Sequence, residues 1–313
     1  MVVLEESSNV FEEAYRALRY ESQIHGASDY VEPVFALVSG DLKGTPCVFE
    51  PRLKFRPGEV TVWGGINGHG KSLLTGQLAL ALMRQGERSC IMSFEMTPPR
   101  SILRMMRQML DHKPTVADVV PFCEELDKSI TFLNTQGAIS PEAVLGAGIV
   151  AVQRFKSQHI FIDNLMKCVG GEDDYNGQKA FVQELCDIAR VLGCHFHLVH
   201  HVRKGKDEFE ELSKFSFRGA SAVVDQVDNA VIIQRNRAKE KAIEEDGFDM
   251  TKDGIEPDTN LRIVKQRNGD FEGTAPLWFN RFRTAFCLDA TRIPVFELTQ
   301  AQKELLEKED CPF

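Results

Sequence analysis

One stretch of this sequence decides the fold class: Gly65-Ile66-Asn67-Gly68-His69-Gly70-Lys71-Ser72. It matches the pattern G-x-x-x-x-G-K-[ST], and it lies between an apolar run at 59–63 and a helical pattern at 70–85. Glycines let backbone N–H groups turn towards phosphate oxygens, and the helix N-terminus adds a partial positive charge. The stretch therefore predicts a phosphate-binding loop, with Lys71 on the outer phosphates and Ser72 as a Mg²⁺ ligand.

Apolar runs alternate with helical patterns on both sides of this loop. The runs cover 59–63, 88–94, 130–133, 159–162, 194–199 and 229–234, and several contain continuous apolar stretches, as in strands buried on both faces. The helical patterns cover 70–85, 98–111, 141–156, 177–192 and 218–226, and three more strands are expected at 260–266, 275–279 and 284–288. This order predicts one α/β domain over 41–300, with a mostly parallel central sheet flanked by helices.

Three segments are expected to lie outside this regular pattern. Residues 1–40 carry one amphipathic helix at about 9–22, which either lies on the main body or docks on a neighbouring subunit. The polar, acidic stretch 238–258 is interpreted as a flexible insertion, and 301–313 as an acidic tail.

Composition places the chain among ordinary globular proteins. Its 313 residues are 43% hydrophobic and 27% charged, and no apolar run approaches the roughly 18–20 residues that a membrane helix needs. The eight cysteines are scattered without a C-x-x-C pair, which disfavours a disulfide scaffold or a cysteine zinc module and indicates reduced thiols. With no secretory signal at Met1, we expect a cytoplasmic protein without a membrane partner.

The net charge of −9 is unevenly distributed. The segments 1–32, 239–258 and 301–313 carry net charges of −5, −5 and −2, so the remainder of the chain is positive by three charges. The overall acidity therefore does not exclude a local basic channel for nucleic acid.

Polar residues follow several of the predicted strands. Asp163 ends the run His159–Ile162 and suits the second Mg²⁺ contact. Glu95 follows the run 88–94 and is either the carboxylate that activates a water molecule or a helix cap before Pro98; its position alone favours neither.

Four histidines lie within 195–201, and strand alternation places His200 on the opposite face from the other three. No carboxylate or thiolate completes a tetrahedral set, so a metal site is disfavoured. His201, at the strand end, fits a sensor of the terminal phosphate.

Basic side chains appear in two later segments. The loop 202–217 is either a solvated surface loop or a nucleic-acid contact, because basic groups bind phosphates and aromatic rings stack on bases. The run Lys265-Gln266-Arg267-Asn268-Gly269 is either a hairpin turn or an arginine finger that enters another subunit's nucleotide site.

Together these pieces resemble the ring-shaped replicative DNA helicases with a RecA-like core, which include DnaB-type helicases, phage primase-helicases and Twinkle. The resemblance covers about residues 40–290. Its most specific parts are Ser93-Phe94-Glu95, Ile160-Phe161-Ile162-Asp163-Asn164-Leu165, Cys194-His195 with His201-Val202-Arg203-Lys204, Arg218-Gly219-Ala220-Ser221 and Lys265-Gln266-Arg267-Asn268-Gly269. The loop residues Asn67, Gly68 and His69 depart from the usual small residues, and His69 has no assigned role.

The resemblance implies a role for each matched position. Catalytic roles fall on Lys71, Glu95, His201, Lys265 and Arg267, with the last two acting on a neighbouring subunit. Nucleotide binding falls on Gly65, Asn67, Gly68, His69, Gly70, Lys71, Ser72, Arg235 and Phe279, and Mg²⁺ binding on Ser72 and Asp163. Contacts to single-stranded DNA fall on Arg203, Lys204, Lys206, Lys214, Arg218 and Gly219.

The resemblance further implies a homo-hexamer that uses ATP, or another nucleoside triphosphate, with Mg²⁺ to move along single-stranded DNA and unwind forks. A separate primase, polymerase or single-strand-binding protein would be its partners, because only about 40 residues precede the core and priming is not expected. Two alternatives stay open: a recombinase of the RecA/RadA type, and a regulatory or helicase-loading ATPase without motor activity.

Overall fold

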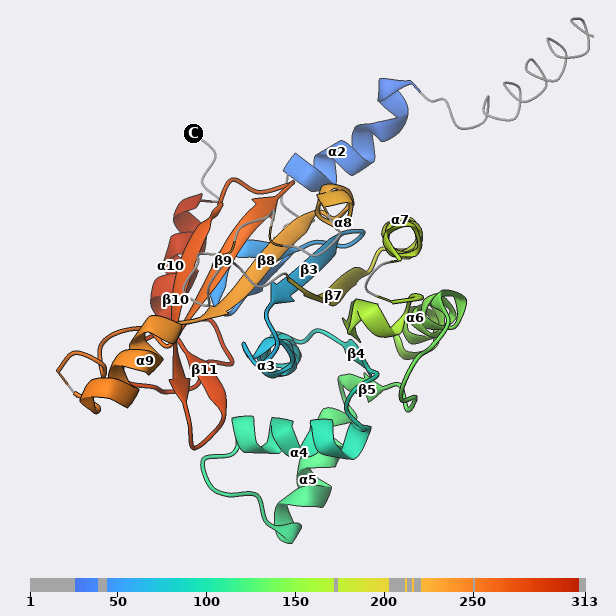
Figure 1. Cartoon of the computed structure of the whole chain (residues 1–313). Helices are drawn as coiled ribbons and strands as arrows, with labels where there is room; N and C mark the ends of the chain where they lie inside the picture. The colour runs from blue at the N-terminus through green and yellow to red at the C-terminus, as the bar shows by residue number, and fades with distance from the viewer. Residues whose placement is uncertain are drawn as a thin grey trace, which may run out of the picture. The chain divides into compact units, whose positions relative to one another are not determined.

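Figure 1 shows a computed structural model of the chain, which describes residues 26–38, 44–171, 174–202, 212, 216, 221–249 and 251–309. The chain divides into two units, Met1–Lys43 and Gly44–Phe313. The described part of the first unit is a 3-10 turn, η2 (Ala27–Tyr30), followed by α2 (Val31–Val38). The helix predicted at about 9–22 lies outside the described residues. Every site residue discussed below belongs to the second unit.

A nine-stranded sheet forms the centre of the second unit, in the order β11-β10-β9-β8-β3-β7-β6-β4-β5. Six strands run parallel: β3 (Val60–Gly65), β4 (Ser89–Ser93), β5 (Ile130–Phe132), β6 (His159–Asp163), β7 (His195–His201) and β8 (Asn229–Arg235). The antiparallel part is β9 (Thr259–Gln266), β10 (Gly273–Asn280) and β11 (Ala285–Cys287). The prediction of a mostly parallel central sheet is confirmed.

Side-chain alternation along the strands gives this sheet two apolar cores. On β3, Val60 and Val62 enter one core, whereas Trp63 enters the other. The first core is covered by α6 (Pro141–Phe155), α7 (Tyr175–Leu192) and α8 (Ser221–Gln226). The second is covered by α3 (Lys71–Arg84), α4 (Pro98–Met109), α5 (Val116–Leu126) and the hairpin of β1 (Thr45–Cys47) and β2 (Glu50–Phe55). Because the sheet is packed on both faces, it is rigid, and the ends of its strands hold the site residues in fixed positions.

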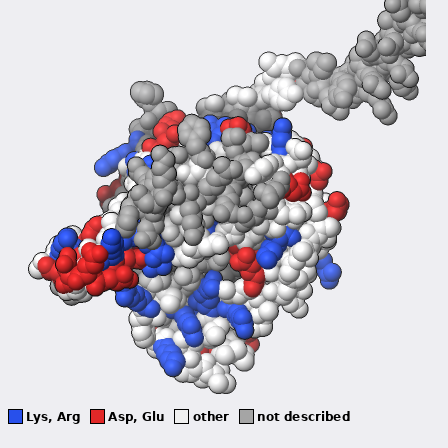
Figure 2. Space-filling model, viewed as in Figure 1, with Lys and Arg blue, Asp and Glu red and all other residues white. Residues whose placement is uncertain are grey.

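Several elements were not predicted. They include the β1–β2 hairpin, α2, α5, α9 (Arg237–Asp246) and α10 (Gln300–Glu309). The segment 238–258, expected to be a flexible insertion, includes most of α9, whose acidic side chains form the red group at the left of Figure 2. The segment 301–313, expected to be a tail, includes most of α10, and Gln302 Nε2 donates to the Val48 carbonyl at 2.9 Å.

Three buried histidines, His159, His195 and His197, lie on the face of the sheet towards the β1–β2 hairpin; we call them the histidine cluster. Trp63 Nε1 donates to His197 Nδ1 at 3.3 Å, and His197 Nε2 lies 3.1 Å from His159 Nδ1. Because His197 Nδ1 must accept, its Nε2 carries the proton and donates to His159. Burial lowers the pKa of His195 to about 4 and those of the other two well below 6.5. The cluster is therefore a neutral hydrogen-bonded core.

Within the described residues, no helix combines the length and apolar character needed to cross a membrane. The seven cysteines in the same part of the chain are free thiols.

Candidate nucleotide-binding site

The predicted polar residues come together at one edge of the sheet. Gly65, at the end of β3, pairs with His201, at the end of β7. Ser93, at the end of β4, pairs with Asp163, at the end of β6. Because β3, β7, β6 and β4 are consecutive and parallel, their carboxyl ends meet at a single edge, which is where open α/β sheets bind ligands.

The loop between β3 and α3 has a backbone that requires glycine. Gly68 and Gly70 have φ values of 82° and 90°. A Cβ on Gly70 would lie 3.0 Å from Phe286 Cζ, and one on Gly65 would lie 2.8 Å from the Ile233 carbonyl oxygen. A side chain at these positions would strain or displace the loop. Asn67 and Gly68 are exposed at its tip.

Lys71 lies buried beneath this loop. Its Nζ donates to the carbonyls of Gly65 at 2.8 Å and Ile66 at 3.2 Å. Burial lowers its pKa to about 8, although nearby Asp163 and Glu95 act in the opposite direction. The ammonium group is thus held at the loop and largely withdrawn from water, where phosphate oxygens would compensate its desolvation.

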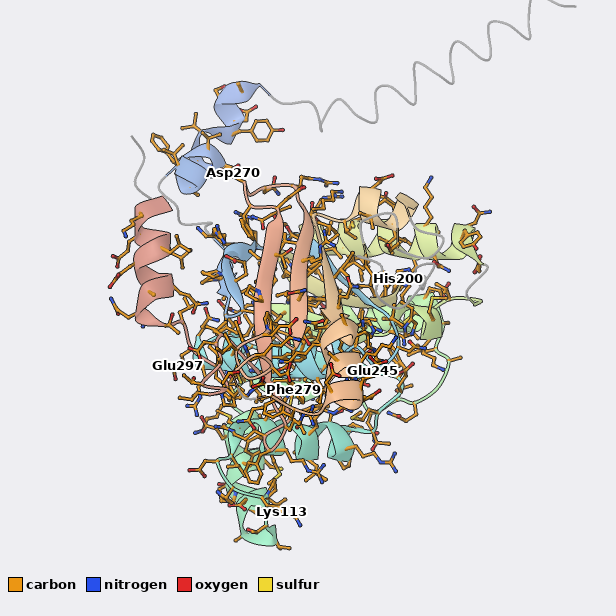
Figure 3. The ribbon with its side chains drawn as sticks, turned by 60° about the vertical axis from the view of Figure 1, so that its left-hand side comes forward. Lys113, His200, Glu245, Asp270, Phe279 and Glu297 are labelled. Atoms are coloured by element: carbon orange, nitrogen blue, oxygen red, sulfur yellow. The ribbon has the colours of Figure 1, made fainter. Side chains whose placement is uncertain are left out.

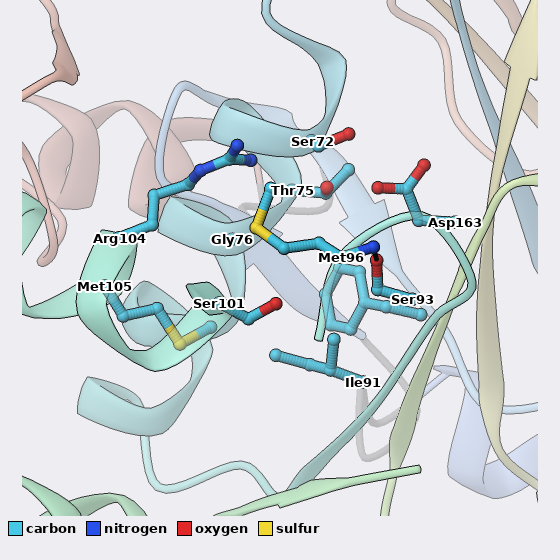
Figure 4. A pocket seen from close by; sticks show the side chains of 11 residues that line it. Ser72, Thr75, Gly76, Ile91, Ser93, Met96, Ser101, Arg104, Met105 and Asp163 are labelled. Carbon is cyan, nitrogen blue, oxygen red and sulfur yellow. Dashed lines mark hydrogen bonds between the residues drawn. The ribbon is translucent and has the colours of Figure 1, made fainter. Parts of the chain in front are cut away.

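Ser72 and Asp163 form the second polar pair of the site. The Ser72 hydroxyl hydrogen-bonds the Asp163 carboxylate, and burial raises the pKa of that carboxyl group. A hydroxyl and a carboxylate oxygen beside a phosphate loop are the oxygen ligands that Mg²⁺ prefers. Both side chains also line the small cavity drawn in Figure 4.

Asn164 connects Glu95 and His201, two residues with predicted roles, although no role was predicted for Asn164 itself. Its Nδ2 donates to Glu95 Oε1 at 2.7 Å and lies 3.1 Å from His201 Nε2. Glu95 does not cap the following helix, because the N-cap of α4 is Thr97; the capping alternative is therefore wrong. The only available signal was that Asn164 is a polar residue directly after Asp163.

The other side of the loop borders a cleft of about 400 Å³ that includes Gly70, Arg235 and Phe279. The Arg235 guanidinium pairs with Glu240 and donates to the Gly68 carbonyl at 3.3 Å. The cleft has the size of a small-molecule site. Arg235 and Phe279 thus lie beside the loop, where the nucleoside part of a nucleotide would extend if the loop bound its phosphates.

His69 is buried under the same loop rather than directed into solvent. Its Nδ1 accepts the backbone N–H of Arg235 at 3.4 Å. Burial lowers the pKa of His69 to about 4, and the charge of Arg237 acts in the same direction. His69 therefore anchors the loop to β8 as a neutral imidazole.

Lys265 and Arg267 lie far from the loop of their own chain. Lys265 Nζ donates to three carbonyls at the C-terminal end of α8, including that of Val224 at 2.7 Å. Arg267 Nη1 pairs with Asp228 Oδ1 at 2.9 Å. The expected turn is present, because β9 and β10 are antiparallel neighbours; a residue beside such a turn can also act as an arginine finger. Figure 3 shows Asp270, in the β9–β10 turn, at the opposite end of the sheet from Phe279.

The predicted DNA contacts Arg203, Lys204, Lys206, Lys214, Arg218 and Gly219 lie outside the described residues. Within their segment Leu212 is described, and both its backbone N–H and its carbonyl form hydrogen bonds. Its N–H donates to Gln234 Oε1 at 3.0 Å, and its carbonyl accepts from Arg262 Nη1 at 2.8 Å.

Comparisons with known proteins agree with this geometry. The AAA domain family matches residues 37–207, more than half of the chain. The ATPase domain of G40P is similar in fold, with a TM-score of 0.68 and 15% identity over 84% of this chain and 98% of that one. A DnaB-like replicative helicase, solved with its interactions with primase, has a TM-score of 0.63 and 16% identity over 90% of this chain and 73% of that one. The predicted RecA-like fold is confirmed, and the chain belongs to the AAA domain family.

Proposed function

We propose that this protein is an ATP-hydrolysing replicative DNA helicase that acts as a homo-hexamer on single-stranded DNA. The observation that carries the proposal is the convergence of Lys71, Ser72, Glu95, Asp163 and His201 on one sheet edge. The fold likeness to the ATPase domain of G40P and to a DnaB-like helicase supports it.

Hydrolysis follows from the chemistry of these side chains. Glu95 accepts a proton from the attacking water, and Asn164 fixes its carboxylate at 2.7 Å. Lys71 stabilises charge that develops on the phosphate oxygens. Ser72 and Asp163 would hold Mg²⁺, which neutralises phosphate charge when bound. His201 is the proposed sensor of the terminal phosphate, and because Asn164 contacts both His201 and Glu95, a change at His201 would reach the catalytic carboxylate.

The position of Arg267 favours an ATP site built between subunits. The Arg267 N–H donates to the Asp228 carbonyl, and the Asp228 N–H donates to the Val60 carbonyl, so Arg267 lies level with the start of β3. Gly65 is five residues further along that strand, about 16 Å away at 3.3 Å per residue. A nucleotide in its own chain is out of reach, whereas one on a neighbouring copy can be reached.

Coupling to DNA rests on chain continuity. His201 ends β7, and the segment 203–220, which contains the predicted DNA contacts, leads directly into α8. Lys265 holds the far end of α8. The nucleotide sensor His201 therefore precedes the proposed DNA-binding segment, and Lys265 holds the far end of the helix that follows it.

The first experiment measures ATP hydrolysis with and without single-stranded DNA, together with unwinding of a forked duplex. We expect DNA to stimulate hydrolysis, the fork to be unwound, and Lys71→Ala to abolish both activities. Nucleotide-dependent filaments without unwinding would instead identify a recombinase. Hydrolysis that ignores DNA would identify a regulatory or loading ATPase.

The second experiment tests the site between subunits. Arg267→Ala and Glu95→Gln chains are each expected to be inactive, and mixing them should restore part of the hydrolysis because some interfaces combine an intact Glu95 with an intact Arg267. A Lys71→Ala and Glu95→Gln mixture is the matched control, since both substitutions affect the same side of the interface. Equal recovery in the two mixtures would refute the trans assignment.

A further inference from the structure

A small cavity of about 40 Å³ lies beside the phosphate loop, on the side away from the nucleoside cleft. Ser72 and Asp163 line one wall, and Ser93 and Arg104 line the others. Figure 4 shows the Arg104 side chain extending from α4 towards Thr75 and Ser72. The roles described so far make no use of Arg104.

Helix α4 holds Arg104 in this position firmly. The helix begins after Thr97, and its buried Met105 and Met106 pack into the core that α3 also enters. Gln108 Nε2, one turn after Arg104, donates to the Leu73 carbonyl of α3 at 2.9 Å. The guanidinium is therefore fixed relative to the helix that carries Lys71 and Ser72.

Arg104 is half-buried, and burial lowers its pKa. The nearby Asp163 charge acts in the opposite direction, yet no hydrogen bond or ion pair joins Arg104 to any residue in the described part of the chain. The basic residues of α4 are Arg100, Arg104 and Arg107, and Figure 2 shows a group of basic side chains over this helix. Arg100 and Arg107 are exposed, so only Arg104 has been withdrawn from solvent.

A partly desolvated guanidinium without a partner is unfavourable unless a ligand supplies the missing anion. Its planar set of N–H donors matches phosphate oxygens. The phosphate loop surrounds the inner phosphates, and Ser72 and Asp163 mark the Mg²⁺ side. A triphosphate held in this way would extend its terminal phosphate beyond Ser72, towards α4.

We propose that Arg104 donates hydrogen bonds to the terminal phosphate of the nucleoside triphosphate bound by its own chain, and so distinguishes triphosphate from diphosphate. This inference rests on the proposed nucleotide-binding function. It assigns to each site two arginines of different origin, Arg104 from the same chain and Arg267 from the neighbouring one.

The test compares Arg104→Met with Arg107→Met, a matched loss of an exposed arginine three residues along the same helix. Binding of Mg²⁺ complexes of ADP and of a non-hydrolysable ATP analogue is measured by titration calorimetry. Arg104→Met is expected to weaken binding of the triphosphate analogue by about tenfold or more, the loss of one charge-assisted contact, and ADP binding by less than about twofold. Arg107→Met should leave both affinities unchanged.

A structural role for Arg104 makes a different prediction: both affinities would fall together, and the ratio of triphosphate to diphosphate affinity would stay at its wild-type value. That result, or no change in either affinity, would overturn the proposal. Arg104→Lys retains the charge and covers the case in which the methionine variant does not fold; it should lower the same ratio to a smaller extent. A wild-type protein that binds neither nucleotide would refute the proposed function as well.

Discussion

The histidine cluster is expected to make this protein sensitive to acid. His159, His195 and His197 have folded-state pKa values far below the ordinary value of 6.5 because burial disfavours their charged forms. The unfolded chain therefore binds more protons than the folded chain below pH 6.5. The stabilising contribution is complete above pH 6.5 and is lost as the pH falls towards about 4, the folded pKa of His195.

The magnitude follows from linkage. One pH unit below 6.5, each buried neutral histidine removes about 1.4 kcal/mol from the free energy of unfolding, so the three remove about 4 kcal/mol between pH 7.5 and 5.5. Typical domains have about 5–15 kcal/mol in total, so the loss is large. His69, with a pKa lowered to about 4, adds a loss of the same sign.

The assay is urea unfolding at pH 7.5, 6.5 and 5.5, followed by tryptophan fluorescence; of the two tryptophans, Trp63 contacts the cluster. His197→Gln keeps an acceptor for Trp63 Nε1 and a donor for His159, but it cannot be protonated. We expect its loss of stability over this range to be smaller than that of the wild type by about 1.4 kcal/mol. Contributions from His69 and the carboxylates cancel in this difference.

The control is His112→Gln, because His112 is exposed and its hydrogen bonds to Asp111 and Asp118 raise its pKa. A raised pKa stabilises the folded state at low pH. Between pH 7.5 and 5.5 this variant should therefore lose at least as much free energy of unfolding as the wild type. Equal losses in wild type and His197→Gln would refute the reasoning.

Two further predictions concern the nucleotide site. Burial lowers the pKa of Lys71 to about 8, although Asp163 and Glu95 act in the opposite direction, so the affinity for Mg–ATP should fall above pH 8. Binding at pH 8.5 should be accompanied by uptake of a proton, which calorimetry in two buffers of different ionisation enthalpy measures. An affinity that does not change between pH 7 and 9 would contradict this prediction. Asn164→Ala removes the amide that fixes Glu95 and lies beside His201. The value of kcat should therefore fall at least about tenfold, because the acid–base group is misplaced, whereas nucleotide affinity should stay near wild type. Steady-state kinetics and binding measurements are made in parallel, and an equal fall in affinity would indicate a structural defect instead.

Much of the central sheet was predictable because its strands are buried on both faces. The runs at 59–63 and 159–162 are mostly apolar, and their order with intervening helices leaves few topologies. The unpredicted elements have weaker local signals. Helix α5 contains Pro121, and β2 carries Pro51 with charged Arg52 and Lys54. Tertiary packing, rather than propensity, stabilises them.

The site divides in the same way. Glycine spacing and strand ends were sufficient to propose the phosphate loop, Glu95, Asp163 and His201. The function of Asn164 depends on three strand ends meeting, and no spacing along the chain encodes that meeting. The withdrawal of Arg104 from solvent depends on how α4 lies against α3, which its sequence periodicity leaves open.

The two edge strands of the nine-stranded sheet disfavour association of copies by strand addition. Both outermost strands, β5 and β11, are only three residues long, and an isolated bridge from Cys287 to Pro294 occupies part of β11. Such short margins offer little backbone for another chain to extend the sheet by strand addition. Contacts between copies at these two edges would instead come from side chains on helices and turns, so an assembly could rearrange there without breaking a continuous ladder of hydrogen bonds.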